Sequence, residues 1–291
     1  ALGAVFVVAG LAFKVGAAPF HMWVPDVYDG APTVVTLMIA GAPKLAAFAI
    51  IMRLLVEGML PLAFDWQQML AVMAIASLLV GNFAAIAQTN IKRMLAFSTI
   101  AQMGFVLLGL VAGVSFTDNV ASTANTANAY SATMFYIVTY VLTTLATFGV
   151  LLLLSSSKLE ANKLSDLAGL NQRNPVMAGV LAAAMFSLAG VPPLVGFYAK
   201  LSVLQALMAS SQAIYIYLAV FAVVMSLVGA FYYLRVVKLM YFDVPEVQDT
   251  IEINADARFV LSLNGLSLLV LGILPSGLMA ICTHAIVELL V

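Results

Sequence analysis

Long apolar runs separated by short polar segments dominate the chain. A helix needs about 20 mostly apolar residues to cross the ~30 Å hydrocarbon core of a bilayer. Runs of that length occupy residues 1–20, 33–56, 67–88, 94–113, 129–154, 176–210, 213–241 and 259–282. The predicted fold class is therefore all-α, a polytopic membrane helix bundle of about eight transmembrane helices.

Glycine and proline fall inside three of these runs and predict discontinuous helices. The first run contains Gly16 and Pro19, and the second contains Gly-Ala-Pro-Lys at 41–44. The sixth run is too long for one straight span, and it carries Gly-Val-Pro-Pro-Leu-Val-Gly at 190–196. Two adjacent prolines remove backbone donors, so we expect this helix to be interrupted.

Composition supports a membrane protein and excludes several other classes. The 291 residues are 64% hydrophobic and 9% charged, whereas soluble domains are about 25% charged. A net charge of −1 gives no indication of nucleic acid as a partner. The single Cys282 excludes an internal disulfide, and His21 and His284 are too few for a convincing metal site. We expect no metal and no bound cofactor in this chain.

Basic residues outside the apolar runs predict the topology. Eight of them fall in loops on one common side: Lys92, Arg93, Lys158, Lys163, Arg173, Arg235, Lys238 and Arg258. Only Arg53 falls on the other side. The positive-inside rule places the common side in the cytoplasm, so both ends of the chain are predicted on the outer, periplasmic side. Because the chain begins within an apolar run at Ala1, without Met, we interpret it as the C-terminal part of a longer protein.

Three lysines lie inside predicted spans, each near a helix break. A cation at the centre of a membrane costs roughly 2.5–3.5 kcal/mol on insertion scales, so Lys14, Lys44 and Lys200 are candidates for function. Burial destabilises the charged form of an amine, which then exchanges protons more readily. Lys14 has an alternative, because its amine can extend to the headgroups. None of the thirteen carboxylates falls within a span, so we expect the counter-ion outside this segment.

Other polar residues within or beside the spans are candidate relays. Ser98, Thr99 and Gln102 lie in the fourth run, where they either line a water-filled half-channel or form hydrogen bonds between helices. His21 is either a proton-entry relay or a histidine at the interface. Tyr198 is either a relay through its hydroxyl or a packed aromatic.

Two polar clusters are expected on the cytoplasmic side. Lys92 and Arg93 are interpreted as an anchor for the loop before the fourth span. Asp26, Tyr28 and Asp29 are predicted to lie in a turn, where they are candidates to cap the next helix.

Three motifs resemble a known family. They are Pro-Phe-His-Met-Trp-Val-Pro-Asp-Val-Tyr-Asp-Gly-Ala-Pro at 19–32, Thr-Asn-Ile-Lys-Arg-Met-Leu at 89–95, and Leu-Ala-Gly-Val-Pro-Pro at 188–193, followed by Gly196, Phe197 and Lys200. Together they resemble the antiporter-like proton-pumping membrane subunits of NADH–quinone oxidoreductase, respiratory complex I.

The resemblance implies an inverted-repeat architecture. Residues 1–56 would hold the last two helices of a first five-helix repeat. Residues 57–242 would form the second repeat, with its broken helix at 190–196, and residues 243–291 would form one extra helix.

The resemblance also implies roles and partners. Lys14 matches the lysine of a first half-channel, Lys44 the central connecting lysine and Lys200 the terminal lysine of the second half-channel. The family's glutamate partner of the first lysine would lie in a preceding helix. Flavin, iron–sulfur and quinone would be held by other subunits, so this chain would have no redox active site. Its partners would be other membrane subunits, including neighbouring antiporter-like ones, within the bacterial inner membrane.

The predicted function is proton translocation coupled to quinone reduction, as one subunit of a translocase. An alternative is a subunit of a multisubunit cation/proton antiporter or of a membrane-bound hydrogenase, in which the same lysines would serve ion exchange. A third possibility is a passive membrane scaffold.

Overall fold

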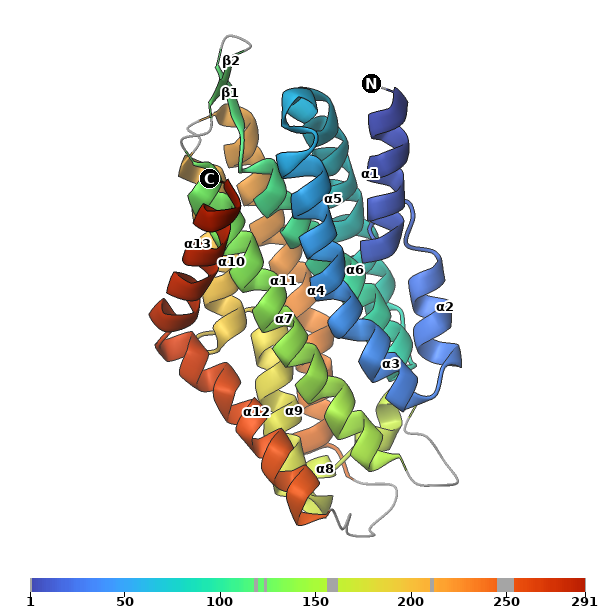
Figure 1. The fold of residues 1–291 in the computed structure, drawn as a ribbon. Helices are drawn as coiled ribbons and strands as arrows, with labels where there is room; N and C mark the ends of the chain where they lie inside the picture. Colours follow the sequence, from blue (N-terminus) through green and yellow to red (C-terminus); the bar gives the residue numbers. More distant parts are fainter. Residues whose placement is uncertain are drawn as a thin grey trace.

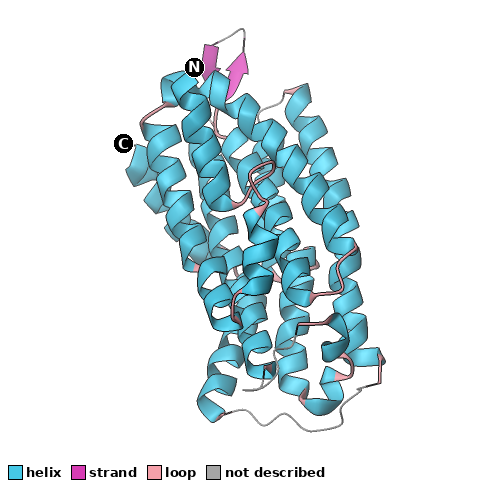
Figure 2. Cartoon of the chain, turned by 90° about the vertical axis from the view of Figure 1, so that its right-hand side faces the viewer, coloured by secondary structure: helices cyan, strands magenta, loops and turns pink. Residues whose placement is uncertain are grey.

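Helices run along one common axis in the computed structural model of the chain (Figures 1 and 2). The structure describes residues 2–117, 120–122, 125–155, 162–209, 212–244 and 254–290. The elements in chain order are α1 (Leu2–Val15), α2 (Trp23–Gly30), α3 (Thr33–Ala40), α4 (Ala42–Ile51), the π-helical η1 (Met52–Glu57), the 3₁₀ turn η2 (Leu60–Leu62), α5 (Ala63–Ile86), α6 (Ile91–Val111), β1 (Ser115–Thr117), β2 (Val120–Ser122), α7 (Thr126–Leu154), the 3₁₀ turn η3 (Leu164–Leu167), α8 (Leu170–Arg173), α9 (Pro175–Ala189), α10 (Val195–Ala209), α11 (Ala213–Phe242), α12 (Ala255–Ile273) and α13 (Ser276–Leu290).

Membrane-spanning length and apolar composition confirm the predicted fold class. Within the described residues, six continuous segments are long and apolar enough to cross a bilayer: Thr33–Glu57, Leu60–Ile86, Ile91–Val111, Thr126–Leu154, Ala213–Phe242 and Ala255–Ile273. The shorter apolar helices are α1, α9, α10 and α13, of which α9 and α10 together form the broken sixth span. Besides the helices, the described part contains a small antiparallel hairpin, in which Phe116 pairs with Ala121, and an isolated bridge between Asn90 and Lys163.

Helix interruptions occur where glycine and proline predict them. The first helix ends at Val15, directly before Gly16. The second span is interrupted at Gly41, between α3 and α4. In the sixth span α9 ends at Ala189 and α10 begins only at Val195, after the two prolines. These breaks leave backbone carbonyls without helical partners at mid-height in the bundle.

The first and last predicted spans differ from the structure. The first does not end at residue 20, because α2 continues the crossing to Gly30 (Figure 1). The proline and the two aspartates of α2 lower the mean hydropathy of residues 23–30. A search for long apolar runs therefore does not detect this helix. The last span consists of α12 and α13, separated at Leu274 and Pro275 and ending later than predicted.

The centre of the bundle is α6. Nearly all of it is buried, and it packs against α2, α5, α7 and α10. By contrast, α11 and α12 keep large apolar side chains on the outside, as expected for faces that meet lipid or other apolar subunits. A central α6 brings its polar residues next to both broken spans.

The described basic residues follow the predicted distribution. In Figure 1 α6 and α12 begin at the lower end of the bundle, and α11 ends there. Arg53 belongs to η1, at the opposite end. Both chain ends lie toward that opposite end as well (Figures 1 and 2). Lys158 lies outside the described residues.

Candidate functional site: two buried lysines at helix breaks

The break after α1 exposes helix carbonyls, and donors from elsewhere in the fold satisfy them. Gly16 adopts φ 78°, in the left-handed region that favours glycine. The indole nitrogen of Trp23, at the start of α2, donates to the carbonyl of Phe13 at 2.9 Å. The carbonyl of Val15 accepts from a lysine, Lys44, at 2.6 Å. The end of α1 is thus held by two side-chain donors.

Lys44 supplies this second donor from α4. Only 1% of its surface is exposed. Its ammonium also lies 5.6 Å from the centre of the Trp23 ring, over the ring face. The carboxyl end of a helix carries a partial negative charge, so the end of α1 stabilises a cation there. Within the described residues, the partner of the Lys44 amine is thus the carbonyl end of a broken helix.

Lys200 occupies a similar position at the second break. Its amine donates to the carbonyls of Leu188 and Ala189 at 2.9 and 3.0 Å and to the hydroxyl of Ser226 at 2.8 Å. The amine also lies 5.3 Å from the ring centre of Phe105. It is 8% exposed, and it too binds the carboxyl end of a helix, here α9.

A small polar cavity adjoins Lys200. Its volume is about 20 Å³, and its lining includes Gln102, Thr143 and Ser187. A second cavity, of about 10 Å³, is lined in part by Ser98 and Thr99. Tyr140 and Leu188 line both cavities. The larger volume is enough for about one water molecule, and its lining offers several hydrogen-bonding groups to such a molecule.

A hydrogen-bond network, which we call the α6 network, centres on Gln102. Its amide nitrogen donates to the carbonyl of Leu188 at 3.1 Å and to the hydroxyl of Tyr233 at 2.9 Å. Its amide oxygen accepts from Tyr136. The Tyr233 hydroxyl lies 2.5 Å from the hydroxyl of Ser98. The carbonyl of Leu188 also accepts a hydrogen bond from the amine of Lys200. The network therefore reaches Lys200 through this shared carbonyl.

The remaining sequence-predicted hydroxyl, Thr99, belongs to a pair that we call the Thr99–Tyr140 branch. This branch meets the network at a shared cavity, which Tyr140 and Gln102 both line. Thr99 donates to the carbonyl of Leu95 at 2.9 Å and accepts from Tyr140 at 2.8 Å. Of the two alternatives for these polar residues of the fourth span, the hydrogen bonds between helices are present. A water-filled half-channel along them stays a prediction.

Sequence reasoning missed the partners of this network on α7 and α11. A signal was present, because α7 repeats hydroxyl residues every three or four positions and these share one helix face. The residues of this series are Tyr136, Thr139, Tyr140, Thr143, Thr144 and Thr147, all buried.

Three predicted candidates are not brought to this network. Lys14 is exposed on the last turn of α1. His21 is half-buried in the turn between α1 and α2, and its Nδ1 forms no direct hydrogen bond within the described residues. Tyr198 packs its ring edge-on against Phe135, with centroids 5.4 Å apart, as the packed-aromatic alternative expects. Their roles in proton transfer stay predictions.

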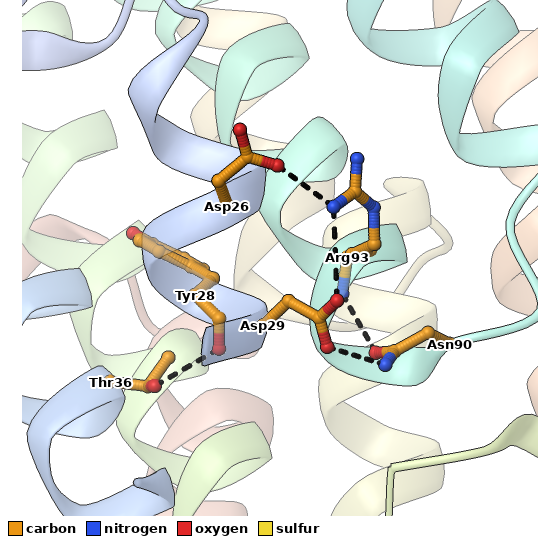
Figure 3. A network of polar contacts seen from close by, with 6 residues as sticks. All are labelled: Asp26, Tyr28, Asp29, Thr36, Asn90 and Arg93. Atoms are coloured by element: carbon orange, nitrogen blue, oxygen red, sulfur yellow. Dashed lines mark hydrogen bonds and ion pairs between the residues drawn. The ribbon is translucent and has the colours of Figure 1, made fainter. Parts of the chain in front are cut away.

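Polar residues at the lower end of the bundle connect α2 to α6, in a group we call the α2–α6 clamp. Arg93 donates to Asp26 at 2.9 Å and forms an ion pair with Asp29 at 3.7 Å (Figure 3). Asn90 donates to Asp29 at 2.6 Å, and Lys92, which is buried, donates to the carbonyl of Ala31 at 3.0 Å.

The clamp corrects the predicted role of the two aspartates. They lie within α2, not in a turn. They do not cap the next helix, since α3 begins after Pro32 without a side-chain cap. The physical reason is that Arg93 and Asn90, at the start of α6, offer them charge-assisted hydrogen bonds.

Comparison with known protein families shows to which family the chain belongs. Residues 1–226 match the family model described as "NADH:quinone oxidoreductase/Mrp antiporter, TM". The chain belongs to this family. Within the described residues, no group of three or more His, Cys, Asp or Glu is placed to hold a metal ion.

Curated relatives in the family are similar over almost the whole chain. NADH-quinone oxidoreductase subunit N of Polaromonas naphthalenivorans is 65% identical over 286 residues, covering 98% of this chain and 56% of the relative. Subunit N of Herminiimonas arsenicoxydans is 60% identical, covering 99% of this chain and 57% of the relative. The chain thus spans a little over half the length of these relatives.

Solved structures of the family share the fold. A chain of respiratory complex I from Thermus thermophilus with bound aureothin superposes with a TM-score of 0.80 at 34% identity, covering 96% of this chain and 58% of that chain. A chain of the Mrp complex from Dietzia superposes with a TM-score of 0.83 at 22% identity, covering 99% and 59%. The second likeness concerns the fold alone.

Proposed function

We propose that this chain is the proton-conducting part of a membrane subunit of NADH–quinone oxidoreductase, of the subunit N type. The observation that carries the proposal is the pair of buried amines, Lys44 and Lys200, each held by the carbonyl end of a broken helix. The 65% identity with a subunit N favours this function over a cation/proton antiporter or hydrogenase subunit. It also supports a bacterial inner membrane location.

The chemistry assigned to each lysine is reversible proton exchange. An ammonium releases one N–H proton to an adjacent water or hydroxyl, and the resulting amine accepts a proton from the other side. No electron moves in this step. The carbonyls at the helix breaks favour the charged form, whereas burial favours the neutral form. A conformational or electrostatic change elsewhere in the complex would shift this balance and drive transfer from Lys14 through Lys44 to Lys200.

The remaining features are assigned on the same basis. Lys14 is exposed, and we propose that its carboxylate partner comes from outside these 291 residues. Flavin, iron–sulfur centres and quinone would belong to other subunits, which are also the partners of this chain. The basic end of the bundle would face the cytoplasm, and both chain ends would face the periplasm. Residues 1–56, 57–242 and 243–291 would correspond to the end of one repeat, a second repeat and an extra helix.

Substitution of the two buried lysines tests the proposal. We expect Lys44→Ala and Lys200→Ala, each in the full-length subunit within the intact complex, to lower NADH-driven proton pumping in inverted membrane vesicles by at least about tenfold. A pH-sensitive dye would report pumping, and the amount of assembled complex would be measured in parallel. The matched control is Lys238→Ala, since that lysine is exposed and pairs with Asp243 at 3.0 Å. Pumping at the wild-type rate in both buried-lysine variants would overturn the proposal in favour of a passive scaffold.

A further inference from the structure

A tyrosine of α2, Tyr28, has a buried hydroxyl that the fold leaves without a direct hydrogen bond. The residue is 0% exposed, and no partner for its hydroxyl is found within the described residues. A phenol of this kind usually finds a partner when buried. Packing holds it in place, because its ring meets Phe148 edge-on with centroids 5.8 Å apart, and its carbonyl accepts from Thr36 at 3.2 Å. A rigidly held, unsatisfied hydroxyl in a polar region requires an explanation.

One face of α2 carries Tyr28 and borders the site of Lys44. Val24 lies against Gly16, beside the amine of Lys44. Tyr28 follows Val24 by four residues and therefore shares its face, about 6 Å further along the helix. The same short helix thus borders the first lysine and carries the unsatisfied hydroxyl.

The Tyr28 side chain borders the α6 network. Its ring meets Phe148, and Phe148 lines the second cavity together with Thr99 and Tyr140, which are hydrogen-bonded to each other at 2.8 Å. Tyr140 in turn lines the cavity that contains Lys200. Water molecules in such small cavities bridge polar groups nearly as well as direct hydrogen bonds.

The α2–α6 clamp fixes the orientation of this helix. Figure 3 shows Asp26 and Asp29 directed toward Arg93 and Asn90, whereas the Tyr28 ring leaves α2 on the other side. The clamp therefore ties the side of α2 away from the Tyr28 ring to the start of α6.

We propose that the Tyr28 hydroxyl is the proton-carrying group that connects the Lys44 side of the protein to the Thr99–Tyr140 branch of the α6 network. The proposal rests on the proposed function. A proton arriving at a lone pair of Oη is matched by release of the original Oη–H proton on the opposite side. The phenol is unchanged after rotation of the hydroxyl, and no oxidant or reductant is required. The aspartates and Arg93 act as positioning residues.

Removal of this single oxygen is the test. Tyr28→Phe in the full-length subunit keeps the ring against Phe148, and we expect it to lower proton pumping in inverted vesicles by about tenfold with a normal amount of assembled complex. The matched control is Tyr130→Phe. Tyr130, on α7, is also 0% exposed and also lacks a hydrogen bond for its hydroxyl within the described residues. Its ring lies against Gly113, just past the C-terminal end of α6, whereas Thr99 lies in the first half of that helix. We expect Tyr130→Phe to pump at the wild-type rate.

A hydroxyl-bearing variant separates proton transfer from packing. Fluorotyrosine at position 28 keeps the ring and the hydroxyl but makes the hydroxyl more acidic. We expect it to restore pumping and to change the pH profile of the rate, which a purely structural role would leave unaltered.

Failure of this proposal is distinguishable from failure of the proposed function. Wild-type pumping in Tyr28→Phe, together with lost pumping in Lys44→Ala, would overturn the tyrosine relay alone. Pumping lost in Tyr28→Phe only in proportion to lost assembly would also overturn it. Wild-type pumping in Lys44→Ala and Lys200→Ala would overturn both.

Discussion

The two helix breaks at the centre of the bundle share one electrostatic design. In Figure 1 α1 reaches mid-height from the upper end, and α9 reaches it from the lower end. Each ends at a left-handed glycine, Gly16 with φ 78° and Gly190 with φ 85°. A side chain on these glycines would come within 3.5 Å of the Lys44 amine and 3.3 Å of the Lys200 amine. In both cases an amine lies at the negative end of a helix, and within the described residues it is held by carbonyls and not by a carboxylate.

The breaks differ in how the lysine is supplied and how many partners it has. Lys44 comes from another span and binds one carbonyl, that of Val15. Lys200 comes from the second half of its own broken span, and binds two carbonyls and a hydroxyl beside a polar cavity. Hydrogen bonds to a charged group each contribute about 1.5–3 kcal/mol. The second site therefore offers an ammonium more hydrogen-bond acceptors than the first.

The largest expected effect concerns the rigidity of the second break. A Cβ on Gly196 would lie 1.8 Å from the backbone oxygen of Ser187, so α10 begins directly against the end of α9. Backbone atoms cannot move aside as a flexible side chain does. We expect Gly196→Ala to cost about 3 kcal/mol or more. The measurement is the melting temperature and amount of the assembled subunit.

Two other glycines give the controls for this substitution. At Gly16 the added Cβ would meet a side-chain carbon of Val24 at 2.6 Å. We expect Gly16→Ala to cost less, about 1–2 kcal/mol, chiefly from its positive φ. Gly179 has open space around it within α9, and Gly179→Ala should be neutral or stabilise by about 0.5–1 kcal/mol. Equal melting temperatures for the Gly196 and Gly179 variants would contradict the close approach of α9 and α10.

Local chemistry explains which parts of this comparison could be predicted from sequence. The breaks were predictable because glycine and proline act on their own backbone. Lys44 and Lys200 were predictable because a cation stands out in an apolar run. The helix α2 was hidden, because Pro25, Asp26 and Asp29 reduce the apolar character that identifies a span.

The contacts that could not be predicted from sequence join residues that lie far apart in the chain. Val15 and Lys44 are 29 residues apart in sequence, and Gln102 meets Leu188 across 86 residues. No local pattern specifies which carbonyl a buried amine will bind. Tyrosines such as Tyr136 and Tyr233 look like ordinary apolar-face aromatics until the packing of α7 and α11 against α6 gives their hydroxyls a common partner.

The second prediction makes the two lysine sites more alike. Ser226→Ala removes one of the three hydrogen-bond acceptors of Lys200 and leaves both carbonyls. Because the lost bond involves a charged donor, we expect it to cost about 1.5–3 kcal/mol in the ammonium form, and to lower proton pumping by about threefold to tenfold. Initial pumping rates in inverted vesicles provide the measurement.

A serine on α10 is the control for this second prediction. The Ser202 hydroxyl donates to the carbonyl of Ala199 at 2.9 Å and does not bind the lysine amine. Ser202→Ala should pump normally, and Ser226→Thr should recover most of the lost rate because it restores a hydroxyl. If Ser226→Ala and Ser202→Ala give the same pumping rate, the Ser226 hydroxyl has no role in proton transfer at Lys200.

The smallest expected effect concerns the indole that completes the first break. Trp23→Phe removes the donor to the Phe13 carbonyl but keeps an aromatic ring beside Lys44. One neutral hydrogen bond is worth about 1 kcal/mol, so we expect a small drop in melting temperature and pumping within about twofold of wild type. Trp66→Phe removes a similar bond, to the carbonyl of Met59 at 3.0 Å, at a site remote from the lysines. If Trp23→Phe abolishes pumping while Trp66→Phe does not, then the indole, and not the carbonyl of Val15, is the group that fixes Lys44, and the two breaks no longer share one design.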